Sequence, residues 1–334
     1  MKSIIKKSFP LLAVLLLPLT ACDDEPEVGS TLYPVEPENY DARLFINETA
    51  MPGNQATLEV IETPVSLLAP EDEITFNVKL TKPVATDVTV TVAENAELAA
   101  AYGNDTEALP AGTLQIANSS VTIKAGSVVS SEAVKMKLNA NDAVKNLASK
   151  GVAAVAISSN NAGIATGTTN NAYYVVLNKK VTNYKGQLAD EIATMNQIAG
   201  SSITATVDGY SASELTDGSL STEFWYWYSG GYDVIFTFNE TTNVRGLGFY
   251  SNAYTGYCPS VIEILTSNDG DNWTSQTGGK VSISWPSSAT ELIPFVLYSA
   301  IPCNYVMLKF YSCFWSSYGS DYDWPAASEV NLYN

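Results

Sequence analysis

The chain has 334 residues, with 17 Lys and Arg against 35 Asp and Glu, and a formal charge of −18. A chain this acidic repels phosphate backbones, which disfavours nucleic acid as a partner. The sequence contains no histidine, and this excludes His-based catalytic triads, histidine acid–base catalysis and zinc sites built on imidazole. Catalysis by carboxylates alone remains compatible with the composition.

The first 21 residues have the parts of a lipoprotein signal peptide. Three lysines precede an apolar run at Phe9–Leu19, which is too short to cross a bilayer. The run closes on Leu19-Thr20-Ala21-Cys22, the small-residue-then-cysteine pattern that a lipoprotein signal peptidase requires. We therefore expect residues 1–21 to be removed and Cys22 to be lipidated, leaving a mature chain of charge −21 whose only attachment to the membrane is the lipid anchor.

Residues 22–38 are acidic, contain Pro and Gly, and show no apolar periodicity, which is typical of a flexible tether. The run Asp23-Asp24-Glu25-Pro26-Glu27 directly after the cysteine resembles the surface-export signal of Bacteroides-type lipoproteins. This resemblance implies an outer-membrane protein that faces the cell exterior. In other bacteria an acidic residue at this place directs retention in the inner membrane, so the localisation depends on the resemblance.

Two β domains of different composition are expected after the tether. All six tryptophans follow residue 224, whereas residues 39–181 are rich in Val, Ala, Thr, Leu and Asn. Strict polar–apolar alternation at 73–80, 87–92 and 134–138 predicts half-buried strands. Further strands are expected at 58–60, 120–123, 152–157 and 173–177, and short helical turns at 97–102 and 142–147. So many short strands predict a sandwich.

The order of these elements, with Leu109-Pro110-Ala111-Gly112, then Val121 to Gly126 and a final Tyr173 to Leu177, resembles the immunoglobulin-like N-terminal domain of Bacteroides surface lipoproteins. The resemblance implies a spacer domain at 39–181. A linker is expected at 182–195.

Three motifs in residues 196–334 together resemble discoidin domains, also called coagulation-factor type C domains, a group that includes family-32 carbohydrate-binding modules. The motifs are Ala212 to Trp225 with a central Asp217-Gly218 turn, Ile264 to Trp273, and Ala326 to Tyr333. The resemblance implies a jelly-roll β-sandwich whose loops bind a ligand. The predicted fold class is therefore all-β, an immunoglobulin-like sandwich followed by a discoidin-type jelly roll.

In the discoidin family a structural calcium is held by the first of these loops together with an acid near the C-terminus. Carried over by motif, the resemblance assigns Ca²⁺ to Glu214, Asp217, Ser219, Thr222, Ser328 and Glu329. Oxygen ligands of this kind suit calcium. The alternative is that Asp217 caps a turn and Glu329 ends a strand.

Aromatic loops are the expected ligand-binding region of the second domain. The loop from Phe314 to Pro325 is too rich in large rings to bury them all, and exposed rings beside short polar side chains suit sugar stacking. The expected ligand-binding residues are Trp315, Tyr318, Trp324, Tyr254, Asn252, Asp321 and Asp323. The resemblance places Trp225 in the core, with Tyr226 and Tyr228 on the opposite face. Galactose-binding relatives usually bring a His and an Arg to the sugar. This chain has no His, reads Ser251-Asn252 where the Arg is common, and has Arg245 too early in the strand to replace it, so the identity of the ligand is not carried over.

The cysteines leave two alternatives. Cys303 and Cys313 lie at opposite ends of one predicted strand, too far apart for a disulfide. Either Cys258 and Cys313 form a bridge that braces the binding edge, or all three cysteines are buried thiols.

The sequence thus favours a non-catalytic, surface-exposed glycan-binding lipoprotein that captures polysaccharide or host glycan for neighbouring uptake proteins. The alternatives are an adhesin or structural surface protein that binds a protein partner and, more remotely, a glycosidase that uses carboxylates. An enzyme of that kind needs two acids on either side of a cleft, and Asp321 and Asp323 are too close in sequence to suggest this.

Overall fold

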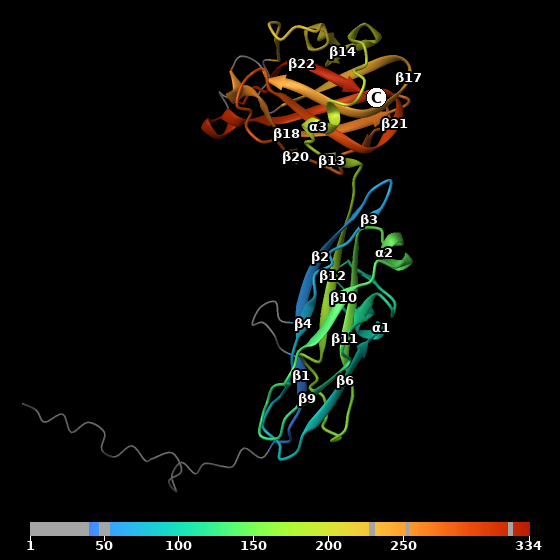
Figure 1. Cartoon of the computed structure of the whole chain (residues 1–334), viewed down its shortest axis with the longest axis vertical. Helices are drawn as coiled ribbons and strands as arrows, with labels where there is room; N and C mark the ends of the chain where they lie inside the picture. The colour runs from blue at the N-terminus through green and yellow to red at the C-terminus, as the bar shows by residue number, and fades with distance from the viewer. Residues whose placement is uncertain (1–39, 47–53, 104, 227–230, 252–253, 320–322) are drawn as a thin grey trace, which may run out of the picture. The chain divides into compact units, whose positions relative to one another are not determined.

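The computed structural model describes residues 40–46, 54–103, 105–226, 231–251, 254–319 and 323–334. Its elements are mostly β-strands with a few short helices (Figure 1), so the all-β fold class predicted from the sequence is confirmed. The strands surround two large hydrophobic cores, one formed by residues 44–177 and one by residues 203–332. None of the helices in this described part of the chain is long and apolar enough to cross a membrane. The predicted signal peptide, Cys22 and the tether lie outside the described residues.

The N-terminal domain contains strands β1 to β12 and two helices. Its strands are β1 (Leu44–Ile46), β2 (Gln55–Glu62), β3 (Leu67–Leu68), β4 (Ile74–Phe76), β5 (Val78–Leu80), β6 (Val88–Glu94), β7 (Glu107–Ala108), β8 (Leu114–Ile116), β9 (Ser120–Ile123), β10 (Val134–Leu138), β11 (Lys150–Asn160) and β12 (Ala172–Val181). The helices α1 (Ala96–Ala101) and α2 (Asp142–Asn146) occupy the two predicted helical turns. The strand order β3-β2-β12-β11-β6-β9 forms the main sheet, and β4-β10-β8 and β1-β5 form smaller ones.

Alternation in sequence becomes alternation in burial in this domain. In β6, Val88, Val90 and Val92 are buried while the threonines between them are half-buried, as expected for a strand with one face on a core. The segment predicted as one strand at 73–80 is divided at Asn77. Its first part, β4, pairs with β10, and its second part, β5, pairs with β1, so one alternating segment serves two sheets.

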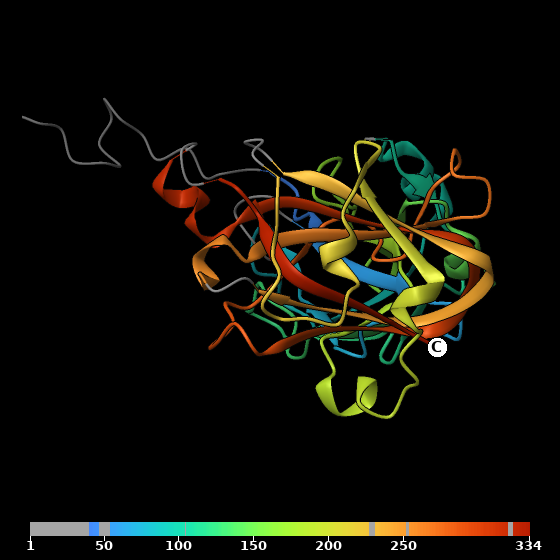
Figure 2. The ribbon, with the colours of Figure 1, turned by 90° about the horizontal axis from the view of Figure 1, so that it is seen from above.

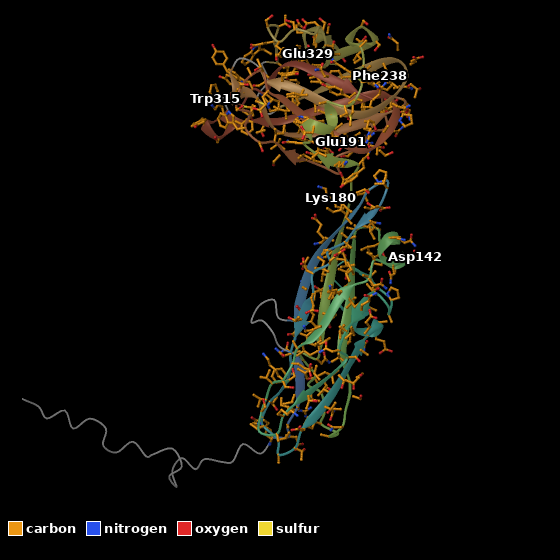
Figure 3. All side chains as sticks on the ribbon, viewed as in Figure 1. Asp142, Lys180, Glu191, Phe238, Trp315 and Glu329 are labelled. Atoms are coloured by element: carbon orange, nitrogen blue, oxygen red, sulfur yellow. The ribbon has the colours of Figure 1, made fainter. Side chains whose placement is uncertain are left out.

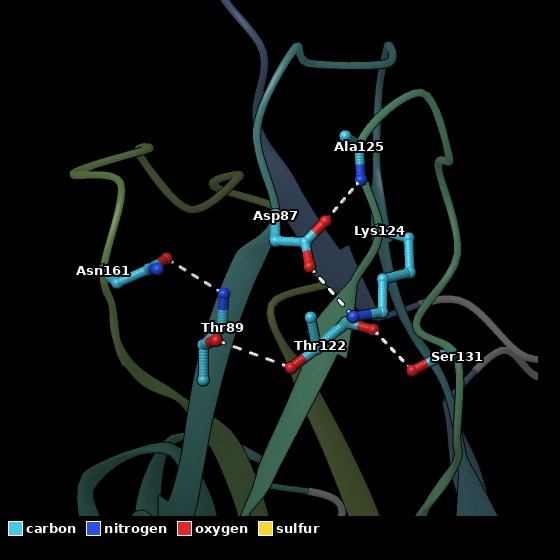
Figure 4. Close-up of polar contacts among 7 residues, drawn as sticks. All are labelled: Asp87, Thr89, Thr122, Lys124, Ala125, Ser131 and Asn161. Atoms are coloured by element: carbon cyan, nitrogen blue, oxygen red, sulfur yellow. Dashed lines mark hydrogen bonds and ion pairs between the residues drawn. The ribbon is translucent and has the colours of Figure 1, made fainter.

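Polar side chains at one end of the β6–β9 pair are used within the N-terminal domain (Figure 4). The Asp87 carboxylate accepts hydrogen bonds from Lys124 Nζ and from the Ala125 backbone N–H, both at 2.9 Å. These two donors hold the pKa of Asp87 below its usual value. Asn161 Oδ1 accepts from the Thr89 N–H at 2.9 Å in the same region. These hydrogen bonds join the beginning of β6 to the segment that follows β9 and to Asn161.

The C-terminal domain begins where β12 ends. Its strands are β13 (Tyr184–Gly186), β14 (Ile203–Val207), β15 (Tyr210–Ser211), β16 (Phe224–Trp225), β17 (Tyr232–Ser251), β18 (Pro259–Ser267), β19 (Thr274–Ser275), β20 (Val281–Ser282), β21 (Leu292–Cys313) and β22 (Ala326–Tyr333). Its helical segments are α3 (Ala189–Ile192), η1 (Gly200–Ser202), η2 (Ser213–Leu215), η3 (Thr255–Tyr257) and η4 (Phe314–Tyr318).

Strands β17 and β21 are long and bent, and each serves both faces of the sandwich. The first half of β17 pairs with β14 and with the second half of β21, whereas its second half pairs with β22 and with the first half of β21. Tyr232 pairs with Phe310 and Tyr250 with Leu292, so both termini of each strand return to one end of the domain. Trp315 lies at that end and Phe238 at the other (Figure 3).

The predicted linker 182–195 is largely structured in the C-terminal domain. β13 pairs with β21, and the buried Asn183 is held on several sides. Its side-chain amide donates to Gln276 Oε1 at 3.1 Å and to the Ser299 carbonyl at 2.9 Å, and its Oδ1 accepts from the Ser299 N–H at 3.0 Å. A buried amide satisfied in this way fixes where the chain enters the sandwich.

Candidate functional site

The rings of the C-terminal domain gather at the end where β17 and β21 begin and finish. The helical segment η4 projects from this end, while the C-terminus lies at the opposite end (Figure 2). We call this group the aromatic edge; it consists of Trp225, Tyr254, Tyr257, Trp285, Phe314, Trp315, Tyr318 and Trp324.

Tyr257 is the central ring of the aromatic edge. Its ring centroid lies 4.6 Å from that of Trp315 and 5.2 Å from that of Trp225, both in edge-to-face geometry. Trp324 stacks nearly parallel to it at 6.5 Å, and Tyr254 meets it edge-to-face at 6.5 Å. Edge-to-face and stacked ring pairs contribute more stabilisation than the burial of their apolar area alone would give. Tyr257 therefore contacts four rings, which come from β16, from its own segment and from the Phe314 to Pro325 loop.

Exposure divides the predicted ligand-binding rings into two groups. Tyr254 is 61% exposed and Tyr318 is 70% exposed, so both can meet a ligand directly. Trp315 and Trp324 are half-buried and present part of a ring while supporting the others. Asp323 lies beside them and accepts a hydrogen bond from the Ser316 hydroxyl of η4. The other two predicted residues, Asn252 and Asp321, lie outside the described residues.

Trp285 belongs to the aromatic edge but was not predicted from the sequence. It is 49% exposed, its ring stacks on Phe314 at 4.8 Å, and its Nε1 donates to Thr255 Oγ1 at 3.2 Å. One face of the indole is thus held by Phe314, and the ring is locked in orientation by a residue of η3. The sequence signal was a lone tryptophan followed by Pro286 in a loop without periodicity.

The prediction that Trp225 lies in the core is wrong. Phe224 and Tyr226 pack against the core instead. Trp225 faces Tyr257, and its Nε1 donates to Glu223 Oε2 at 2.9 Å. The reason is the register of β16, in which Phe224 pairs with Ala327 of β22 and alternation sends Trp225 to the opposite face. Trp227 and Tyr228 lie outside the described residues.

Gly256 is required for the close approach of Trp315. A Cβ at this position would overlap the Trp315 indole. We predict that Gly256→Ala leaves the sandwich folded but displaces Trp315 from Tyr257, because the overlap involves loop side chains and no core strand. Near-ultraviolet circular dichroism, which reports fixed aromatic packing, should change while the far-ultraviolet spectrum stays the same. An unchanged near-ultraviolet spectrum would contradict the packing described for these two residues.

Two of the three cysteines of the C-terminal domain, Cys258 and Cys313, lie at the base of the aromatic edge. Cys258 follows η3 and Cys313 precedes η4, and the Phe314 N–H donates to the Cys258 carbonyl at 3.3 Å. Both are buried, as is Cys303, and none of the three is in a disulfide. The structure thus shows the buried-thiol alternative and not the Cys258–Cys313 bridge. Burial raises the pKa of Cys258 to about 12, which makes its reactive thiolate scarce.

The residues assigned to calcium lie on η2, on the loop that follows it, and on β22, where that strand pairs with β16 and β17. Thr222 Oγ1 lies within hydrogen-bond distance of three acceptors: the two carboxylate oxygens of Asp217, at 3.0 and 2.8 Å, and the Ser219 carbonyl at 3.0 Å. The Gly218 N–H donates to Glu329 Oε2 at 3.1 Å. The loop thus brings carboxylate, hydroxyl and carbonyl oxygens together, which are the ligand types that calcium prefers.

Glu329 gives the test of whether these residues fit a cation. Its side chain is only 4% exposed, and burial, together with the nearby negative charge of Asp217, raises its pKa to about 7 despite the Gly218 and Ser219 N–H donors. The preceding residue Ser328 is buried, and its hydroxyl turns away to the Ser251 carbonyl. On Glu214, Oε2 is buried without a hydrogen-bond partner. Two neighbouring acids, one of them desolvated, fit a site for a divalent cation.

No group of three or more Cys, Asp or Glu side chains able to hold a metal occurs in the described residues. A cation at the Asp217–Glu329 position would therefore rely on backbone carbonyls and hydroxyls for its remaining ligands.

Two clefts of the domain lie away from the aromatic edge. One of about 430 Å³ is lined by the hairpin around Asp269 and by Cys303, and one of about 450 Å³ is lined by residues such as Gln197, Glu240 and Asn334. The Asp269 carboxylate already accepts hydrogen bonds from the backbone N–H groups of Asp271 and Asn272 and from the Asn272 side-chain amide. Neither cleft has an aromatic ring in its lining, so neither matches the chemistry of the edge.

Comparisons with known proteins agree with a two-domain β protein. A protein-family model described as a "-like, N-terminal domain" matches residues 40–164. No curated protein matches the sequence. A crystal structure of a two-domain protein of unknown function from Bacteroides fragilis is similar, with 16% identity and a TM-score of 0.53 over 89% of this chain and 96% of that one. This likeness shows a shared fold.

Two family-32 carbohydrate-binding modules from Clostridium perfringens also match part of the chain. One, solved with GalNAc-β-1,3-galactose, has 14% identity and a TM-score of 0.34, over 42% of this chain and 100% of that one. The other, from NanJ and solved with galactose, has 15% identity and a TM-score of 0.35, over 41% of this chain and 98% of that one.

Proposed function

We propose that this chain is a non-catalytic glycan-binding protein and that the aromatic edge of the C-terminal domain is its binding surface. The observation that carries the proposal is the set of exposed rings at Tyr254, Trp285 and Tyr318, of which Tyr254 packs on Tyr257 and Trp285 packs on Phe314. The apolar C–H face of a sugar stacks on such rings, while its hydroxyls bond to polar groups at the rim. Asp323 is placed to accept from a hydroxyl.

The remaining parts of the proposal concern where the protein acts. The cysteine motif at 19–22 supports a lipid anchor at Cys22. The acidic residues after it support export to the exterior face of the outer membrane. The N-terminal domain, whose polar groups bond to one another, acts as a spacer. In this arrangement the protein captures polysaccharide or host glycan and passes it to neighbouring uptake proteins.

The direct test is a glycan array probed with residues 23–334, which omit the signal peptide and Cys22. We expect binding to a limited set of glycans, and loss of that binding in Gly256→Ala, which keeps every exposed ring but displaces Trp315. The bound glycan should be recovered intact after incubation, because the proposal involves no cleavage. If no glycan binds at millimolar concentration, the proposal is wrong and a protein ligand becomes the better explanation of the exposed rings. Cleavage of the glycan would instead favour the carboxylate-dependent glycosidase.

A further inference from the structure

The acidic side chains around the aromatic edge are a feature that glycan binding alone does not explain. Glu223 accepts a hydrogen bond from Trp225 Nε1 at 2.9 Å, and Asp323 accepts one from the Ser316 hydroxyl of η4. Glu291 accepts from the Ser287 N–H and hydroxyl, both at 2.6 Å, in the loop that carries Trp285. These hydrogen bonds hold Glu291 as a carboxylate, with its pKa below the usual value. Three acids from separate segments thus border the rings.

Basic side chains do not balance these acids. Residues 196–334 contain three cations, Arg245, Lys280 and Lys309, against 13 acids. Lys309 Nζ is paired with Asp233 at 2.9 Å, and Arg245 with Glu191 at 3.2 Å. Arg245 also follows Val244, which pairs with Ile301 at the far end of the domain.

Lys280 is the remaining cation, and it too is engaged. Its Nζ lies 3.9 Å from the centre of the Tyr311 ring, a cation–π geometry. The Tyr311 hydroxyl in turn donates to Glu263 Oε2 at 2.6 Å. This group lies on the solvent face of β18 and β21, so Lys280 is directed at Tyr311 and Glu263 within the sheet face.

We infer that the aromatic edge selects uncharged glycans and rejects those that carry carboxylate or sulfate groups. The inference rests on the proposed function and narrows its ligand class. Carboxylates accept hydrogen bonds from sugar hydroxyls, so these acids strengthen the binding of uncharged glycans. A carboxylate or sulfate group on the glycan would instead be repelled by the negative charges of the same acids. Two unit charges about 6 Å apart in water repel enough to weaken binding about threefold, so three acids give about a tenfold or larger discrimination.

The test uses pairs of oligosaccharides with the same backbone, one neutral and one carrying a single carboxylate or sulfate. Isothermal titration calorimetry with residues 23–334 is expected to give a Kd at least about tenfold lower for the neutral member. The difference should shrink as salt is raised from 0.02 M to about 0.5 M, because salt screens exposed charges. Equal or tighter binding of the anionic member overturns the inference but leaves glycan binding intact. Failure of both members to bind refutes the proposed function as well.

Matched variants locate the effect. Glu291→Gln keeps the hydrogen bonds to Ser287 and is expected to reduce the discrimination about two- to threefold. Asp271→Asn removes one exposed acid from the hairpin at the far end of the domain. This variant should leave the discrimination between the neutral and the anionic glycan unchanged. Lys280→Gln should not weaken binding of either member; a loss of anionic binding in Lys280→Gln would show that this lysine recognises anions and would overturn the inference.

Discussion

Tyr257→Ala is expected to abolish glycan binding, with a loss of at least about 30-fold in affinity, or about 2 kcal/mol. Tyr257 itself is half-buried, but Trp225, Tyr254, Trp315 and Trp324 all rest on its ring. Removing it leaves these rings without their common support, so several stacking surfaces are lost at once. Isothermal titration calorimetry against the best ligand from the array measures the effect.

Two further variants separate loss of the site from loss of the fold. Tyr257→Phe keeps the ring and should bind like the unchanged protein. Tyr298→Ala removes a half-buried tyrosine at the other end of the domain, where its N–H bonds to Asn183, and should also leave binding intact. If Tyr257→Ala still binds within about threefold, the aromatic edge is not the glycan site.

Two of the loops that form the aromatic edge were predictable, but the loop of Trp285 and the contacts between the loops were not. The Phe314 to Pro325 loop is recognisable by its ring content alone, and Trp315, Tyr318 and Trp324 do lie together at one end of the domain. Tyr257 and Trp285, in contrast, acquire their importance from contacts with residues about 30 to 60 positions away. Loops lack the periodicity that would tell which ring faces which, so such pairs follow only from the packed sandwich.

The strands show the same division between local and distant information. Alternation correctly predicted β6 and β10 because one face of each lies on a core. The segments around Val234–Phe238 and Leu247–Tyr250 have readable strand patterns of their own, yet both belong to the single strand β17. That continuity depends on a register shift against β21 between Thr237 and Thr242 and on the replacement of β14 by β22 as the other neighbour. No local pattern reports either change. Together these changes bring both ends of β17 to the aromatic edge.

Calcium is expected to stabilise the C-terminal domain in a strongly pH-dependent way. Without a cation, Glu329 has a pKa of about 7 in the folded protein against 4.5 for an ordinary glutamate. Between these values the folded state binds more protons than the unfolded state, so stability falls as the pH rises from about 4.5 to about 7. One pKa unit corresponds to about 1.4 kcal/mol, so a difference of about 2.5 units makes the loss about 3.5 kcal/mol. For a domain of this size that corresponds to roughly 10 °C in Tm.

A divalent cation at Asp217 and Glu329 would remove this penalty, since it compensates both charges. Thermal unfolding followed by tryptophan fluorescence reports this domain selectively, because every tryptophan lies after residue 224. At pH 8 we expect a Tm about 10 °C higher in calcium than in chelator, and at pH 5 almost no difference. An equal Tm with calcium and with chelator at pH 8 would exclude the site.

Glu329→Gln provides the decisive comparison, because it keeps an acceptor for the Gly218 N–H while removing the buried charge. Its Tm in chelator should be nearly independent of pH between 5 and 8 and should no longer respond to calcium. Asp271→Asn, which removes an exposed acid elsewhere in the domain, should keep both responses. A variant with a flat pH profile that still gains stability from calcium would separate the two effects, assigning the pH dependence to Glu329 and the cation to other oxygens. The paired prediction therefore requires that one buried carboxylate both titrates near neutral pH and holds the metal.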